Sequence, residues 1–166
     1  MIFFKAAGLY IASDILCLFI SATFTGMGNN PLLNAVCAVC TFGIIVIMEL
    51  NSGMTAARRD MKQARISKTE AGWNNAAAMT AGTAIIPLAS WGMLLLSKHG
   101  GPDFYRWHKL INAAFLKIFN FICRDASSEK LTDAQVWAVL PFAFAAAAAF
   151  LAGYVLVRLD IIPEKE

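Results

Sequence analysis

Charged side chains are scarce in this sequence, at 15% of 166 residues, whereas apolar residues make up 58%. Soluble domains average about 25% charged residues. The apolar residues gather in blocks close to the roughly 20 residues that cross a hydrocarbon core, and these blocks lack the polar face of a soluble helix. The composition therefore argues against a soluble fold and predicts an all-α integral membrane protein with one domain, residues 1–166.

Catalytic and metal-binding signatures are also missing. The sequence has no G-x-S-x-G, no H-E-x-x-H and no phosphate-binding glycine loop. Its two histidines, His99 and His108, form no metal-ligand pattern with cysteines or carboxylates. The net charge of +3 is modest, and no nucleic-acid-binding motif accompanies it. We expect no metal, no cofactor and no nucleic-acid partner, and the sequence favours a protein that is not an enzyme.

Four apolar blocks predict a membrane four-helix bundle. A tight turn rich in glycine and asparagine separates the first two blocks, and a longer polar segment follows the second. Prolines inside the third and fourth blocks are compatible with membrane helices, because neighbouring helices can satisfy the freed carbonyls. The predicted spans are residues 3–24, 32–50, 76–96 and 136–159.

The basic residues predict an orientation. The turn after the first span has none, whereas the loop after the second span has five: Arg58, Arg59, Lys62, Arg65 and Lys68. Because basic loops stay in the cytoplasm, both termini are expected to be cytoplasmic. The basic residues of the loop between the third and fourth spans oppose this assignment.

That loop holds the clearest periodic pattern, over residues 104–123. Phe104, Trp107, Ile111, Phe115, Ile118 and Ile122 line one helical face. The opposite face carries the basic side chains Arg106, Lys109, Lys117 and Arg124. The pattern predicts an amphipathic helix in the membrane interface, with these four residues at lipid headgroups. A fifth span is the alternative, at a cost of roughly 2.5–3.5 kcal/mol for each basic residue at mid-bilayer.

Asp14 is the most informative single residue. The apolar run after it is too short to cross alone, so Asp14 falls near the middle of the first span. A carboxylate there costs several kcal/mol unless it is protonated or paired, and Ser13, Thr41, Thr80 and Thr83 are the available hydroxyl partners. Two interpretations stay open: a proton or cation site, and a protonated Asp bonded between helices.

Glu49 and Asn51 lie at the inner end of the second span. They could form an ion or headgroup site at the cytoplasmic mouth. An ion pair between Glu49 and Arg58 or Arg59 is the simpler interpretation, because such pairs form readily at helix ends.

A ladder of small residues follows one face of the fourth span, at Ala145, Ala149 and Gly153. Small residues spaced four positions apart let helix backbones approach closely. The ladder predicts packing within one bundle, and a homo-oligomer interface is the alternative.

The cysteines suggest a redox function as another alternative. Cys37 and Cys40 form a C-x-x-C in the second span, and Cys123 lies in the second outer loop. This layout resembles the DsbB family of quinone-linked thiol oxidases, in which the pair reoxidises a partner and quinone accepts the electrons. The family has two cysteines in that loop and an Arg shortly after the pair, whereas this chain has Cys123 alone and Thr41-Phe42-Gly43 after the pair.

A broader resemblance covers most of the chain. Its motifs are Glu49-Leu50-Asn51-Ser52-Gly53 before Arg58-Arg59-Asp60, and Tyr105-Arg106 before the run Leu110-Ile111-Asn112-Ala113-Ala114-Phe115. Their order resembles small four-span membrane proteins of Gram-positive bacteria. The resemblance implies a bacterial cytoplasmic membrane and supplies no activity.

Three functions remain open at this stage. The preferred one is a homo-oligomeric transport or channel-type protein, in which copies of Asp14 form a ring of acids around an axis. The second is an accessory or scaffold subunit bound to a larger membrane protein. The third is the thiol oxidase. Membrane lipids are expected partners in every case.

Overall fold

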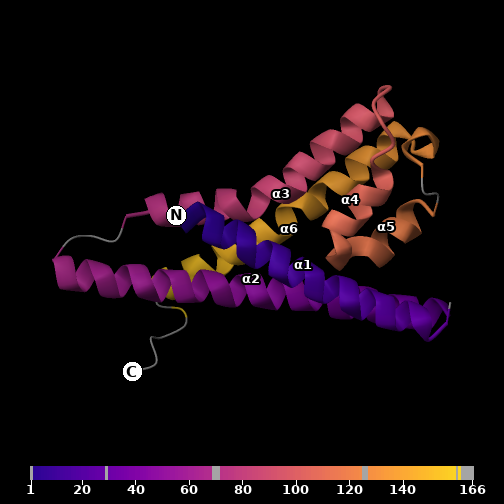
Figure 1. Ribbon diagram of the computed structural model, residues 1–166. Helices are drawn as coiled ribbons and strands as arrows, with labels where there is room; N and C mark the ends of the chain where they lie inside the picture. Colours follow the sequence, from indigo (N-terminus) through magenta and orange to yellow (C-terminus); the bar gives the residue numbers. More distant parts are fainter. Residues whose placement is uncertain (1, 29, 69–71, 125–126, 160, 162–166) are drawn as a thin grey trace.

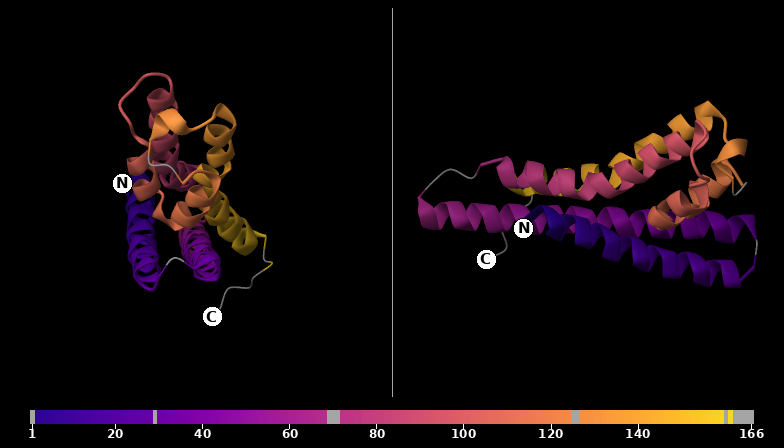
Figure 2. Two further views of the ribbon diagram at one scale, coloured as in Figure 1. Left: turned by 90° about the vertical axis from the view of Figure 1, so that its right-hand side faces the viewer. Right: turned by 45° about the horizontal axis from the view of Figure 1, so that its top comes forward.

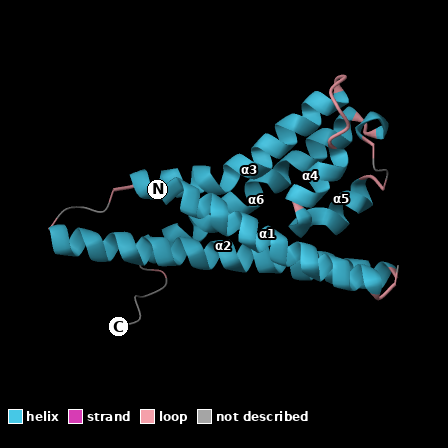
Figure 3. Ribbon diagram, viewed as in Figure 1, coloured by secondary structure: helices cyan, strands magenta, loops and turns pink. Residues whose placement is uncertain are grey.

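The computed structural model describes residues 2–28, 30–68, 72–124, 127–159 and 161, and every regular element among them is helical (Figure 3). The tail Glu164-Lys165-Glu166 lies outside the described residues. The elements are α1 (Ile2–Gly26), α2 (Pro31–Ser67), α3 (Asn74–Lys98), α4 (Tyr105–Ile111), η1 (Ala113–Phe115), α5 (Leu116–Ile122), η2 (Ser128–Lys130) and α6 (Asp133–Arg158).

Four of these helices are long and apolar enough to cross a membrane, namely α1, α2, α3 and α6. The prediction of an all-helical membrane bundle is thus confirmed. The bundle has two ends (Figure 1). At one, which we call the terminal end, α1 begins and α6 ends. At the other, the hairpin end, α1 turns into α2, and α4 and α5 lie between the α1–α2 pair and the α3–α6 pair (Figure 2).

Helix α2 runs well beyond the predicted end of the second span, from Pro31 to Ser67 instead of stopping near residue 50. Its start follows from Asn30, whose side chain accepts a hydrogen bond from the Leu32 amide, and from Pro31 in the first turn. The added turns consist largely of strong helix formers, so the polar segment continues the helix. Lys68 ends it in a left-handed conformation, with φ of 53°.

Helix α3 bends along its length, and this bend separates the two helix pairs at the hairpin end (Figure 1). Pro87 lies inside α3, where its ring removes one backbone donor and displaces the preceding turn. Helix α6 begins at Asp133, three residues before the predicted start at residue 136, because Thr132 and Gln135 form a reciprocal capping box.

Helices α2 and α6 cross with their backbones in close contact. A Cβ atom on Gly153 would overlap the Leu50 carbonyl of α2, and one on Gly53 would overlap the Phe150 carbonyl of α6. Gly153 of the predicted ladder therefore serves packing within one chain. Ala149 is also buried, and Ala145 is partly buried against the core.

The predicted single helix over residues 104–123 is instead a hairpin of two short antiparallel helices, α4 and α5, joined by the turn η1. The Tyr105 hydroxyl joins them, because its one proton is shared between the carbonyl oxygens of Phe119 and Cys123, both at 3.2 Å. Phe115, expected on a lipid-facing side, is fully buried at the turn. Folding back buries this aromatic surface, which a flat interfacial helix would leave against lipid.

Candidate functional site

The tip of the hairpin meets a buried carboxyl of α1 and a buried hydroxyl of α2. The backbone N–H of Ala114 donates to Asp14 Oδ1 at 3.2 Å. The Thr41 hydroxyl donates to the Ala114 carbonyl oxygen at 2.8 Å. Asp14 is the middle residue of α1 and is 7% exposed. The tip therefore reaches the middle of the bundle, and we call Asp14, Thr41 and Ala114 the tip site.

The tip site explains why a broken helix is tolerated at this depth. A helix end leaves backbone donors and acceptors without partners, and lipid offers none. Here Asp14 and Thr41 supply one acceptor and one donor to the same residue. Thr41 was an expected partner of Asp14, but it bonds the same backbone unit instead. The carboxyl's partner comes from the segment that was predicted to lie on the membrane surface.

A series of hydrogen-bonded polar groups leads from the tip toward α3. The Tyr10 hydroxyl donates to Asn112 Oδ1 at 3.1 Å, and Asn112 Nδ2 donates to Ser90 Oγ at 3.3 Å. A hydrogen bond of 2.9 Å joins Ser90 Oγ and His108 Nδ1. Burial lowers the pKa of His108, which lies in α4, to about 4, so its imidazole is neutral at physiological pH. This series has no signature in the sequence, because its members lie far apart along the chain, on α1, on α3, on α4 and in the turn after α4.

Glu49 carries a second buried carboxyl, outside the tip site. Its side chain is 0% exposed, and neither carboxyl oxygen has a hydrogen-bond partner among the described residues. It belongs to a buried stripe of α2 in which every fourth residue faces the bundle: Cys37, Thr41, Ile45, Glu49, Gly53 and Ala57. The expected ion pair with Arg58 or Arg59 is absent from the described structure. Glu49 follows Thr41 by eight residues, about 12 Å along the helix.

Asn51 is separated from Glu49 despite their closeness in sequence. Residues two apart on a helix face different sides, and Asn51 is exposed where Glu49 is buried. The structure therefore does not bring Glu49 and Asn51 together in one site.

The four basic residues predicted at lipid headgroups do not share one surface. Lys109 is only 7% exposed, and its ammonium group donates to Asn120 Oδ1 at 2.8 Å and to the Cys123 carbonyl at 3.1 Å. It also lies 4.2 Å from the centre of the Tyr105 ring. Lys117 donates to Thr25 Oγ1 at 2.9 Å. Arg106 and Arg124 alone are exposed. The expectation for Lys109 is corrected: it joins α4 to α5.

We expect Lys109→Gln to destabilise the protein by about 1.5–3 kcal/mol, the usual worth of hydrogen bonds to a charged group. Thermal unfolding in detergent measures the effect. Arg106→Gln is the control, because it removes the same charge from an exposed position of the same helix. Equal stability of the two variants would mean that Lys109 does not hold the hairpin together.

The cysteines lie in different surroundings, and all four are free thiols. Cys37 is buried beside α1, with its sulfur 3.9 Å from Ser21 Oγ, whereas Cys40 is exposed on α2. Cys123 packs in another cluster, with Leu94, Tyr105, Leu131 and Val136. The structure therefore does not bring Cys123 together with the C-x-x-C pair.

Comparisons with known proteins add no family to this description. No protein-family model matches the chain, and neither a curated protein nor a solved structure is significantly similar to it. The function is therefore argued from the site alone.

Proposed function

We propose that this protein moves protons or small cations across a membrane, as a transport or channel-type protein, with Glu49 and Asp14 as its ion-binding carboxyls. The observation that carries the proposal is the carboxyl of Glu49, completely buried and without a hydrogen-bond partner in the described structure. Burying a polar group without a partner costs about 1–3 kcal/mol. Within membrane bundles, ionisable groups of this kind mark ion paths and proton relays.

The two carboxyls occupy successive depths, which suits stepwise transfer. Asp14 and Thr41 both bond Ala114, so they lie at a similar depth, and Glu49 lies about 12 Å beyond Thr41 along α2, away from the turn between α1 and α2. Tyr10 lies one turn before Asp14 on α1, and its hydroxyl donates to Asn112 of the hairpin. A proton or cation entering at Glu49 would therefore meet a second oxygen ligand further along the same bundle.

The proposed path differs in one respect from a ring of acids around an oligomer axis. Asp14 faces the hairpin of its own chain and is 7% exposed. In a homo-oligomer each copy would thus carry its own path. We propose a bacterial cytoplasmic membrane, as the resemblance of the sequence implies. The terminal end would lie inside, because the exposed basic residues Arg59, Lys62 and Lys68 lie in the C-terminal part of α2 or directly after it.

We expect Asp14→Asn to reduce proton or cation flux to background in proteoliposomes while the protein stays folded. Asn keeps the size of the side chain but cannot bind and release a proton. A pH-sensitive dye or an ion-selective electrode measures the flux. Ser13→Ala is the matched control, because the Ser13 hydroxyl bonds only its own helix in the described structure, at the Leu9 carbonyl.

Wild-type flux in Asp14→Asn would overturn the assignment of Asp14. Absence of flux in the wild type, together with a hetero-complex of fixed stoichiometry in native mass spectrometry, would instead support an accessory subunit.

A further inference from the structure

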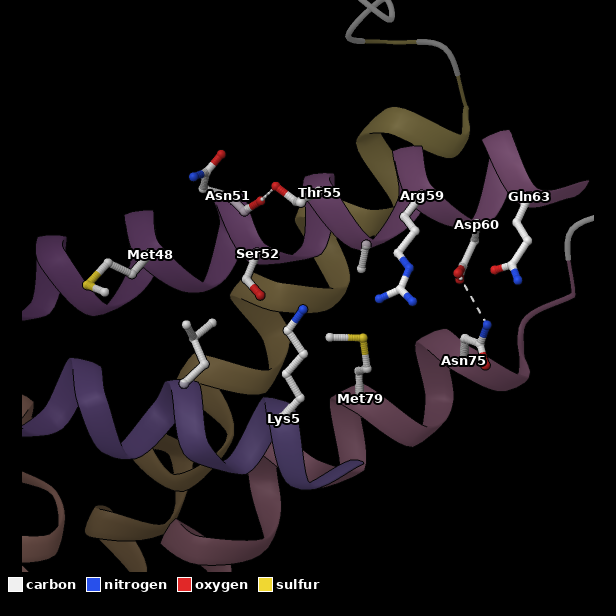
Figure 4. Close-up of a pocket in the computed structure, with 12 residues that line it drawn as sticks. Lys5, Met48, Asn51, Ser52, Thr55, Arg59, Asp60, Gln63, Asn75 and Met79 are labelled. Carbon is white, nitrogen blue, oxygen red and sulfur yellow. Dashed lines mark hydrogen bonds between the residues drawn. The ribbon is translucent and has the colours of Figure 1, made fainter. Parts of the chain in front are cut away.

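A second polar site lies at the terminal end, apart from the buried carboxyls. It is a cavity of about 360 Å³ between α1, α2 and α3 (Figure 4). Leu9, Met48 and Met79 give it an apolar wall, and most of the polar side chains that line it come from α2. An apolar wall beside polar groups suits an amphiphilic ligand.

Two cations from different helices point into this cavity. Lys5 extends from α1 toward α2, and Arg59 extends from α2 toward Met79 of α3 (Figure 4). Within the described part of the chain, neither forms an ion pair. Asp60 is the one acidic residue among those that line the cavity. Its oxygens already accept hydrogen bonds from Asn75 Nδ2 at 3.2 Å and from the Tyr154 hydroxyl at 3.1 Å.

We propose that this cavity binds the phosphate group of an anionic membrane lipid, with Lys5 and Arg59 on the phosphate and the acyl chains along Leu9, Met48 and Met79. Arg59 offers a planar fork of donors that matches two phosphate oxygens, and Lys5 adds a point charge. The position favours a lipid over a free anion. Lys5 is in the first turn of α1, where a spanning helix enters the headgroup region, and basic pockets between membrane helices select anionic headgroups.

The test is lipid binding, measured by native mass spectrometry on the full chain in neutral detergent. The ligands are phosphatidylglycerol, phosphatidylcholine with the same acyl chains, and inorganic phosphate. We expect phosphatidylglycerol to bind in preference to phosphatidylcholine. The double variant Lys5→Gln/Arg59→Gln should bind phosphatidylglycerol roughly tenfold more weakly or worse, since each cation near a headgroup contributes to affinity.

The control is Lys62→Gln/Lys68→Gln, which removes two exposed charges from the same end of α2 without touching the cavity. Its phosphatidylglycerol affinity should stay within about twofold of the wild type, because surface charges away from a bound headgroup are screened. Equal weakening in both double variants would overturn the proposal. Displacement of the lipid by inorganic phosphate at the same concentration would also overturn it, in favour of a free anion. Flux is not measured, so the result is independent of the proposed transport function.

Discussion

Glu49→Met is expected to stabilise the protein and to abolish its ion flux. Methionine fills a similar volume without a polar group, so the variant removes the cost of a buried carboxyl that has no partner in the described structure. That cost is about 1–3 kcal/mol. The same change removes the only carboxyl group in the buried stripe of α2. Thermal unfolding and proteoliposome flux, measured on the same preparation, test both halves of the prediction.

Two controls distinguish the effect of losing the carboxyl group from the effect of changing the shape of the side chain. Glu49→Gln keeps the size and the polarity, so it should lose flux without gaining stability. Ile45→Met introduces methionine one turn earlier on the same stripe and should keep the flux. A Glu49→Met protein that is less stable than the wild type would show that Glu49 has a structural partner. Retained flux would remove Glu49 from the path.

Gly153→Ala is expected to destabilise the bundle by about 1–3 kcal/mol, the range for overpacking a tight contact. The new methyl group would meet the Leu50 carbonyl of α2, which is backbone and cannot rotate away. The two helices would have to separate along the crossing, and Gly53→Ala should act in the same way through the Phe150 carbonyl. The midpoint of thermal or detergent-induced unfolding measures the loss.

Gly43→Ala is the matched control for these glycines. It lies inside α2, and a Cβ there has nothing within 4 Å in the described structure. Because alanine is the better helix former by about 1 kcal/mol, this variant should be as stable as the wild type or slightly more stable. Similar stability losses at Gly43 and Gly153 would show that the loss at Gly153 does not come from the helix crossing.

The span positions could be predicted from the sequence, because the length of each apolar block can be read directly from the residues that form it. The end of α2 could not, since the charged residues after Leu50 mark the end of the apolar block without ending the helix. Gly153 was predicted as a packing residue from its spacing. Gly53, the second glycine at this crossing, was not, because a contact between helices depends on the register in which they cross.

The hairpin was the main difference between expectation and structure. The spacing from Arg106 to Arg124 fits one amphipathic helix, and nothing in that spacing marks a break at Asn112. The break becomes favourable only when Asp14 and Thr41 receive the freed backbone groups. Because those partners lie about a hundred and about seventy residues away in sequence, a local pattern cannot reveal them. Asp14 was recognised as needing a partner, but its partner is a backbone amide that carries no signature.

The docking of the hairpin tip against α1 and α2 has a consequence for biogenesis. Ribosomes make α1 and α2 first, so Asp14 and Thr41 enter the bilayer before residues 105–122 exist. Until the hairpin inserts, the Asp14 carboxyl lies in an incomplete bundle and lacks its hydrogen bond from the Ala114 amide. The backbone N–H and carbonyl of Ala114 at the tip likewise have no partners inside lipid until Asp14 and Thr41 are in place. Insertion of the hairpin is therefore a late step of assembly, and it closes the interior of the protein only after translation has passed α5.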